Sequence, residues 1–489
     1  MRPPRPRHAL WLAALALLLL GAAAGVAALE VHPANPRWLT EDGGATALVL
    51  TGAHAWSLFQ DYDPAPPFEA TRYLRGLAGD GHNFTRGWAW EDGWYSPLPF
   101  ARERGLYRLS PPYRKSYLKR LRQRIRAARR HGLYVSVMLF QGWSVGDHGG
   151  RRHPAPWPLH PFNRANTAER VTKQEGDLHI GRAQTQQLEY VAYLARKLCR
   201  EPNLIWEIAN EPDALSLSGR SGTMWQRQIL KTLESECDRR LTWVSCPDTL
   251  GLSVEQKRQL NDTLVTVGAD LVAPCDPKGR YLTDPPFADG RAVVIADSDH
   301  FGPPDWEWAW KAFLRGQHPL FMDLTQELPW WQGAPWDPDD AAWRHVRRAL
   351  GAIQEIAGAV NRVREGRVAS GLAAMAPQVN AGGTPGDQQR PASSDWTLFS
   401  SDAPCPQSRG HCIPAETNGD EVLAWAEPGQ TLEVCSLHPG ERYRVRWKRA
   451  RARGYHGGGR SRPAGATGCL TLPNPASLPA VLHVERLTG

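Results

Sequence analysis

The strongest constraint on the fold is a regular alternation of strand-like and helix-like segments between residues 46 and 363. Eight short apolar runs, many of them rich in β-branched residues, lie at 45–54, 82–88, 133–140, 204–210, 241–246, 270–275, 292–297 and 319–323. Segments with helical spacing of their apolar residues lie between several runs and after the last one, at 113–131, 188–199, 305–316 and 343–360. Strands that alternate with helices are typical of a parallel sheet covered by helices. Eight such units predict an α/β fold, a (β/α)8 TIM barrel over residues 35–367.

The sequence changes character after Arg367. Gly, Pro, Ser and Gln dominate residues 378–394, a linker-like stretch with too few apolar residues to fold alone. Short β-like segments separated by Pro and Gly turns follow, at 421–426, 431–436, 443–448 and 481–484. These segments predict a small antiparallel β-sandwich domain over residues 395–489.

Residues 1–28 have the pattern of a secretory signal peptide, because Arg2, Arg5 and Arg7 precede an apolar run that ends in small residues. The run of about 20 residues is also long enough to span a bilayer, so an uncleaved membrane anchor stays an alternative. We therefore expect an exported protein, secreted or periplasmic, with membrane attachment only if this segment is retained.

Eight cysteines in an exported chain are typical of disulfides. Four lie in each predicted domain, and none forms a zinc-like CxxC pair. Spacing alone does not fix the connectivity. Cys435 with Cys469 would join two predicted strands, and Cys405 with Cys412 would close a short loop.

Basic residues are densest at 114–130, within a chain of formal net charge +8. Apolar residues recur among them at three- and four-residue spacing, which is typical of an amphipathic helix with a solvated basic face that ends at Gly132. No aromatic platform or nucleic-acid-binding motif accompanies the charge, so we expect no nucleic-acid partner. The sequence predicts neither a cofactor nor an oligomeric state.

Polar side chains end or follow all eight predicted strands. In a TIM barrel, chemistry collects where the strands end, at the C-terminal rim. Each of these residues alone could be a helix N-cap or a solvated loop residue, but together they predict a polar site. They are His54, Arg86, Gln141, Asn210 with Glu211, Asp248, Asp276, Asp297 with Asp299 and His300, and Asp323.

The fourth run, within "NLIWEIANEPDA" at 203–214, ends in an amide, a carboxylate and a proline. Pro212 has no N–H and cannot extend the ladder, so the strand presents Glu211 at the rim. Glu207 has the same strand parity and lies about 13 Å deeper, at about 3.3 Å per residue. We expect Glu207 to be a structural carboxylate, paired with a partner such as Arg86.

Two carboxylates that face each other across a sugar can hydrolyse a glycosidic bond. The seventh run offers Asp297 and Asp299, which share one side of the strand, with Asp299 nearer the mouth. Because the fourth and seventh strands of eight lie nearly opposite, Glu211 and Asp299 are the predicted catalytic pair.

Tryptophan supports a sugar site, because its flat apolar face matches the C–H surface of a sugar ring. The chain has 21 tryptophans. Several are expected soon after strand ends and not in helix cores: Trp56, Trp88, Trp90, Trp94, Trp143, Trp306, Trp308, Trp330 and Trp331. We select Trp88, Trp143 and Trp330 as sugar contacts.

The segment "IWEIANEP" resembles the strand-four signature of clan A retaining glycoside hydrolases. The resemblance implies that Glu211 is the general acid/base and that Asn210 binds a sugar hydroxyl. "GHNFTRGW" at 81–88 is similar to the strand-two pattern of that clan, which implies that Arg86 belongs to the site. We place Asp297, His54 and His300 around the sugar as well.

More narrowly, "NPRWLTEDGGATALVLTGAHAW" and "DSDHFGPPDWEWAWKAFLRGQHPLFMD" resemble an apiosidase-like or cellulase-like branch of glycosidases, over about residues 35–365. That branch often carries a C-terminal β module of the collagen-binding type. "GERYRVRWKRARARG" is similar to a degraded form of the closing motif of the module.

The chain departs from the clan at the nucleophile. The clan has a glutamate at the end of strand seven, whereas this chain has aspartates, and Asp299 occupies the nucleophile position. An aspartate is one methylene shorter. A carboxyl separation of about 5–5.5 Å suits retention, and one of about 6.5–9.5 Å admits a water and suits inversion.

Three hypotheses follow for the function. The first is a secreted glycoside hydrolase that cleaves an O-glycosidic bond in a poly- or oligosaccharide. The second is a glycan-binding barrel without catalysis, suggested by the missing strand-seven glutamate. The third is metal-assisted hydrolysis through Asp297, Asp299, His300 and Asp323, although no HxH or HExxH pair is present.

Overall fold

The computed structural model describes most of the chain from residue 27 to residue 487. The described ranges are 27–63, 66–89, 91–145, 156–173, 178–212, 219–238, 240–246, 253–274, 292–297, 306–322, 341–362, 371–379, 396–399, 420–434 and 437–487. Residues 1–26, most of the predicted signal segment, lie outside these ranges.

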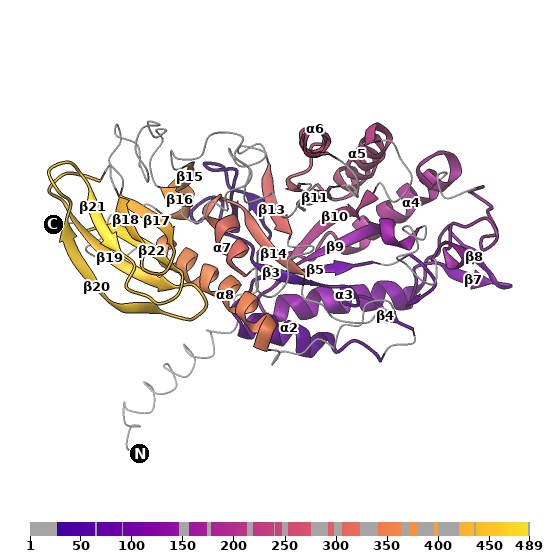
Figure 1. Cartoon of the computed structure of the whole chain (residues 1–489). Coiled ribbons are helices and arrows are strands. Elements are labelled where there is room, and N and C mark those ends of the chain that lie inside the picture. Colours follow the sequence, from indigo (N-terminus) through magenta and orange to yellow (C-terminus); the bar gives the residue numbers. More distant parts are fainter. Residues whose placement is uncertain are drawn as a thin grey trace, which may run out of the picture.

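Eight parallel strands close into a barrel in the order β10-β11-β12-β13-β14-β3-β5-β9 (Figure 1). Each of the eight predicted runs overlaps one barrel strand, so the TIM-barrel prediction is confirmed. The strands are β3 (Gly52–Ala55), β5 (Phe84–Trp88), β9 (Tyr134–Gln141), β10 (Leu204–Asn210), β11 (Thr242–Ser245), β12 (Leu271–Ala273), β13 (Val293–Asp297) and β14 (His318–Met322).

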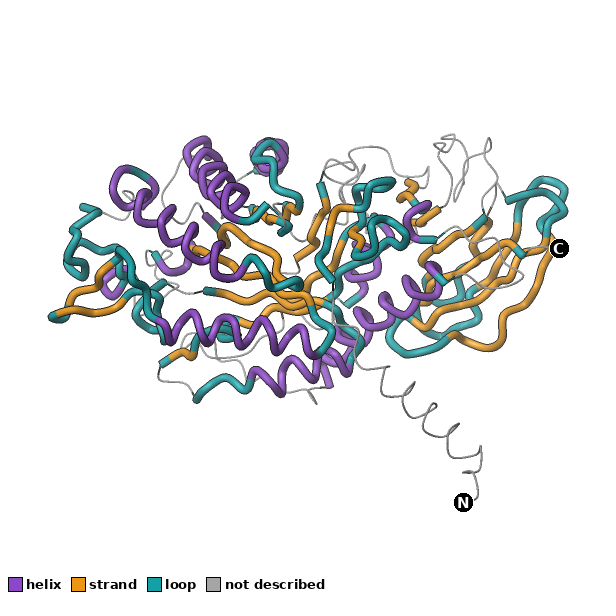
Figure 2. The backbone as a smooth tube through the Cα atoms, turned by 180° about the vertical axis from the view of Figure 1, so that it is seen from behind, coloured by secondary structure: helices purple, strands orange, loops and turns teal. Residues whose placement is uncertain are grey.

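Helices surround this barrel (Figure 2). The four helical segments predicted from periodicity are confirmed as α3, α4, α7 and α8. Helix α3 buries Tyr117, Leu121 and Ile125 along one face and ends before Gly132, whose φ is 74°. The helices are α2 (Ala70–Gly79), α3 (Lys115–Arg130), α4 (Gly181–Leu198), α5 (Gly219–Glu236), α6 (Val254–Val265), α7 (Glu307–Leu314) and α8 (Ala341–Asn361).

Short strands and 3-10 helices lie outside the eight barrel strands. Three two-stranded sheets pair β1 (Glu30–Val31) with β2 (Leu39–Thr40), β4 (Asp61–Tyr62) with β6 (Tyr95–Ser96), and β7 (Ala101–Glu103) with β8 (Leu106–Arg108). Short 3-10 helices are η1 (Gly142–Ser144), η2 (Trp157–Leu159) and η6 (Leu372–Ala374). Of these, η1 directly follows barrel strand β9, so it lies at the C-terminal rim.

The C-terminal part forms a separate antiparallel β domain, as predicted, but its first strand, β15, begins at Ala376, before the predicted start of the domain at residue 395. A six-stranded sheet has the order β15-β16-β17-β22-β19-β20, and β18 pairs with β21. Leu432 and Leu472 of the smaller sheet share one core cluster with Val422 and Leu482 of the larger sheet. The strands are β15 (Ala376–Val379), β16 (Trp396–Phe399), β17 (Glu421–Ala426), β18 (Thr431–Val434), β19 (Arg442–Arg449), β20 (Tyr455–Pro463), β21 (Leu470–Pro473) and β22 (Ala480–Arg486).

The β domain packs against barrel helices α7 and α8, at the opposite end of the molecule from β7 and β8 (Figure 1). Trp310 of α7 donates its indole N–H to the carbonyl of Ala450 at 2.8 Å. Trp306 lies 6.0 Å from the ring of Trp425, and the guanidinium of Arg451 lies 4.8 Å from the Trp306 ring. The two domains therefore share a specific, buried interface.

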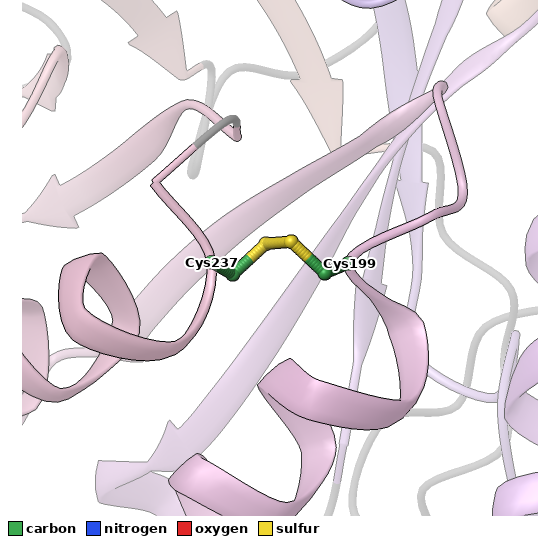
Figure 3. Close-up of a disulfide and its surroundings, with 2 residues drawn as sticks. All are labelled: Cys199 and Cys237. Atoms are coloured by element: carbon green, nitrogen blue, oxygen red, sulfur yellow. A yellow bond between two sulfur atoms is a disulfide. The ribbon is translucent and has the colours of Figure 1, made fainter.

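A disulfide joins Cys199, after α4, to Cys237, after α5 (Figure 3). Cys246 and Cys469 are also disulfide-bonded. The predicted pairs Cys435–Cys469 and Cys405–Cys412 include residues outside the described ranges and stay predictions. None of the described helices has the length and apolar composition needed to cross a bilayer.

Candidate active site

Arg86, the middle residue of barrel strand β5, organises the polar centre of the barrel. Its Nε donates to Glu207 Oε2 at 2.8 Å, and its Nη2 donates to Glu207 Oε1. The Ser136 and Ser245 hydroxyls also donate to Glu207, at 3.2 and 3.0 Å. The predicted structural pair of Glu207 with Arg86 is thus confirmed, and four donors satisfy a carboxylate that is fully buried.

The same guanidinium reaches the two strands that carry the predicted catalytic residues. Arg86 Nη1 donates to Asp297 Oδ2 at 2.8 Å, and Nη2 donates to Asn210 Oδ1 at 3.1 Å. Asn210 ends β10 and Asp297 ends β13, on opposite sides of the barrel order. One cation therefore brings the ends of strands four and seven to a common point.

Glu211 lies directly after β10 and is half-buried. Its backbone has φ 44°, a left-handed conformation that few residues other than glycine adopt. Such conformations cost roughly 1–3 kcal/mol and persist where the surrounding structure holds them. The indole N–H of Trp143, in η1, donates to Glu211 Oε2. Backbone and side chain of Glu211 are thus both held at the rim.

His54, at the end of β3, lies beside Asp297. Its Nε2 is 3.5 Å from Asp297 Oδ1, and its ring stacks on Trp88 with an interplanar angle of 14°. The His54 side chain is fully buried, whereas Asp297 keeps a small exposed fraction of 7%. Asp297 is therefore a nearly buried carboxylate that accepts from Arg86 and lies beside the His54 ring.

Aromatic side chains gather over this end of the barrel. Trp56, Trp94 and Trp143 pack against a cluster that contains Trp88 and Tyr95. The expectation of tryptophans near the strand ends is met by these residues. Such a cluster offers flat apolar faces beside the carboxylates.

Two tryptophans differ from the expectation. Trp308 lies within α7, where it is buried, and Trp306 directly precedes that helix and contacts the β domain. Their apolar surface is used for helix and domain packing, because α7 lies between the barrel and the β domain. Trp90, Trp330 and Trp331 lie outside the described residues.

Glu91 is a buried carboxyl near the rim that the sequence pattern does not single out. Burial raises its pKa well above the usual range, with a smaller effect in the same direction from the charge of Asp92. The backbone N–H of Gln141 donates to Glu91 Oε2 at 2.9 Å. Gln141 itself is fully buried at the end of β9. Glu91 lies in the loop that follows strand β5, where no sequence pattern distinguishes it, so only the tertiary contact reveals it.

Among the described residues, a possible metal-binding group lies in the β domain. Ligand atoms of Glu421, His483 and Glu485 lie within 4.8 Å of one another, and all three side chains are buried. Arg444 and Arg446 donate to Glu485 Oε1 at 3.2 and 3.0 Å. Glu485 thus contacts two guanidiniums and Glu421 contacts the His483 ring at 2.6 Å, so we interpret the group as a buried polar network.

Several predicted site residues lie outside the described part of the chain. They are Asp248, Asp276, Asp299, His300, Asp323 and Trp330. Of the predicted metal ligands, Asp297 alone is described. Within the described residues, the structure brings His54, Arg86, Asn210, Glu211 and Asp297 together, linked by Trp88 and Trp143.

Comparison with known protein sequences finds one relative that we report here. No family model matches the chain. A protein of Oryza sativa subsp. japonica named "Putative mannan endo-1,4-beta-mannosidase 9" is 26% identical over 271 residues, covering 54% of this chain and 61% of that protein. The match thus spans less than two thirds of the length of this relative.

Solved structures with a similar fold are glycoside hydrolases. A glycoside hydrolase family 5 structure from Bacteroides vulgatus ATCC 8482 covers 94% of this chain and 93% of its own, with TM-score 0.56 and 14% identity. The endo-1,4-beta-mannanase from Rhizomucor miehei covers 65% of this chain and 98% of its own, with TM-score 0.50 and 13% identity. These likenesses show the fold. At such low identity they do not assign the chemistry.

Proposed function

We propose that the protein is an exported glycoside hydrolase that cleaves an O-glycosidic bond in a poly- or oligosaccharide by a two-carboxylate mechanism. The observation that carries the proposal is the contact of one guanidinium, that of Arg86, with both Asn210 and Asp297. Asn210 is next to Glu211 in the chain, so a sugar above Arg86 would have a carboxyl group on each side.

Glu211 is the proposed general acid and base. In the first step a carboxylate from the end of β13 attacks the anomeric carbon, the bond from that carbon to the leaving oxygen breaks, and Glu211 gives its proton to that oxygen. In the second step Glu211 takes a proton from water, whose oxygen displaces the carboxylate from the anomeric carbon. The protein is regenerated, and one water is consumed for each bond cleaved.

The carboxylate opposite Glu211 is Asp299 in the sequence-based assignment, with Asp297 as a sugar contact. The contacts of Asp297 support a stronger role for it, since Arg86 orients this carboxylate and the His54 ring lies 3.5 Å from it. The variants Asp297→Asn and Asp299→Asn separate the two residues. The nucleophile variant should lose a larger factor in kcat, because the attacking group is then absent.

Retention is the proposed outcome, with an aspartate in place of the usual glutamate. If the shorter side chain left a gap wide enough for a water, the same carboxylate would act as a base and the product would be inverted. The anomer first released, followed by NMR, decides between these outcomes.

β-1,4-Mannan is the first substrate to test, because the curated relative and one similar structure carry mannanase names. The aromatic cluster of Trp56, Trp88, Trp94 and Trp143 supports a carbohydrate ligand. The disulfide Cys199–Cys237 supports export, because disulfides persist in oxidising compartments. The signal peptide, the apiosidase-like or cellulase-like branch and the collagen-binding type of the β module stay predictions.

The test is incubation of the mature protein with a panel of plant and microbial glycans, including β-1,4-mannan, with measurement of reducing ends. Release by the wild type that is lost in Glu211→Gln supports the proposal. Binding to a glycan without any release across the panel would favour the non-catalytic glycan-binding barrel. Loss of activity in a chelator would instead favour metal-assisted hydrolysis.

A further inference from the structure

One residue holds both ends of the short turn that carries Trp143. The turn runs from Gln141, the last residue of β9, through η1 to Ser144. The N–H of Gln141 donates to the Glu91 carboxyl at 2.9 Å, and the N–H of Glu91 donates to Ser144 Oγ at 3.4 Å. Trp143 lies between these two anchored residues, and its indole N–H donates to Glu211.

The carboxyl of Glu91 lies in surroundings that disfavour its charged form. Its side chain is 6% exposed, and burial raises its pKa well above the usual range. The ionisable groups around it are Asp92 on the same segment, Tyr117 on α3 and Tyr190 on α4. None of these is a cation, so nothing among them stabilises a carboxylate at this place. Burial and the nearby Asp92 carboxylate therefore both favour the protonated form of the Glu91 carboxyl.

We propose that Glu91 is a positioning residue: it fixes the turn 141–144 so that Trp143 holds the Glu211 carboxyl in place for proton donation. The proposal rests on the proposed glycosidase function, and it adds a residue that touches neither the substrate nor the reacting atoms. The chain of contacts is Glu91 to the backbone of Gln141, along η1 to Trp143, and from Trp143 to Glu211.

A fixed acid matters for this chemistry because proton donation requires the carboxyl within hydrogen-bond reach of the leaving oxygen. Glu211 follows the end of a strand in a strained backbone conformation, with φ 44°. The Trp143 indole N–H donates a side-chain hydrogen bond to this carboxyl. Displacement of the turn would therefore misplace the acid while leaving the Arg86 network intact.

The variants follow from the hydrogen bond that the Glu91 carboxyl accepts from the Gln141 N–H. Glu91→Gln keeps the size and an acceptor for the Gln141 N–H, so it should behave as the wild type. Glu91→Ala removes the acceptor, and Glu91→Asp withdraws it by one methylene. Glu201→Ala is the matched control, because Glu201 is also buried, at 5% exposure, but it pairs with Arg126 on the outer surface of the barrel.

The first readout needs no substrate. The Trp143 indole N–H resonance, assigned by its absence in Trp143→Phe, should keep its position in Glu91→Gln and Glu201→Ala. It should move in Glu91→Ala. If the alanine variant fails to fold, Glu91→Asp replaces it in the test, and the resonance should move in that variant. An unmoved resonance in folded Glu91→Ala or Glu91→Asp would overturn the proposal, whatever the enzymatic activity.

The second readout uses leaving groups and so depends on the glycosidase function. Loss of acid catalysis slows the first step, measured as kcat/KM, by about 10²–10⁴-fold for substrates with poor leaving groups and spares those whose leaving group needs no proton. Glu91→Ala should show this contrast between a natural glycan and an activated aryl glycoside of the same sugar. An equal loss on both substrates would contradict a role through Glu211. A wild type without hydrolysis would refute the proposed function and leave the NMR test of the positioning contact standing.

Discussion

The replacement Arg86→Met should destabilise the barrel more than any surface charge change. It removes a guanidinium that is 1% exposed and that donates to Glu207, Asp297 and Asn210. Glu207 and Asp297 would then be two buried carboxylates without a cation. Removal of one partner of a buried pair costs about 3–5 kcal/mol.

Two features of the structure adjust this magnitude. The Ser136 and Ser245 hydroxyls still donate to Glu207, and hydrogen bonds to a charged group contribute about 1.5–3 kcal/mol each. The variant can also protonate one carboxyl, whose pKa would then lie above its unfolded value. The native variant would bind more protons than the unfolded chain, so its stability should fall as pH rises, by about 1.4 kcal/mol per pH unit for one proton.

Urea unfolding at pH 5 and pH 8 measures both effects. We expect a loss of about 3–5 kcal/mol at pH 8 and a smaller loss at pH 5. The control is Arg72→Met, which breaks the exposed pair Arg72–Glu69 with side chains that are 56% and 70% exposed. That pair should contribute about 0–1 kcal/mol. If Arg86→Met cost no more than the control, or if its cost did not depend on pH, the buried ion network would be wrong.

Two further predictions concern the frame of the barrel. Burial lowers the pKa of His318 to about 4 from 6.5, and Leu50 donates its N–H to His318 Nδ1 at 2.9 Å, so stability should fall by about 3 kcal/mol between pH 6.5 and pH 4. In His318→Gln this part of the pH dependence should disappear from the unfolding curve, and its persistence would show that other groups cause it. A Cβ at Gly52 would lie 1.9 Å from the Phe84 carbonyl oxygen, so Gly52→Ala should cost about 1–3 kcal/mol or more, whereas Gly79→Ala meets nothing within 4 Å and should not destabilise. Equal melting temperatures for the two alanine variants would contradict the close strand contact.

The barrel strands could be predicted because each is a short apolar run between helical segments. The pairing of Glu207 with Arg86 could also be predicted, since strand parity places Glu207 deep in a barrel where a carboxylate needs a cation. Strand β20, in contrast, has the sequence YHGGGRSRP and is largely exposed. Its pairing with β19 defines this strand, and its sequence has no apolar alternation from which a strand could be predicted.

Tertiary contacts explain the remaining differences at the site. Glu91 becomes a buried carboxyl with a raised pKa because the turn after β9 folds over it, and that turn is distant in sequence. Trp308 is of a residue type that often binds sugars, but it lies within α7 and is buried there. The contact of Trp143 with Glu211 likewise depends on the course of η1, which sequence spacing does not determine.

The most direct test of the proposed chemistry is the rate of reducing-end release from β-1,4-mannan and related glycans by the wild type and by Glu211→Gln. The glutamine side chain can still accept the Trp143 indole N–H, so the fold should be kept. We predict release by the wild type and a loss of about 10²–10⁴-fold in the variant. Equal rates for the two proteins would contradict Glu211 as the proton donor.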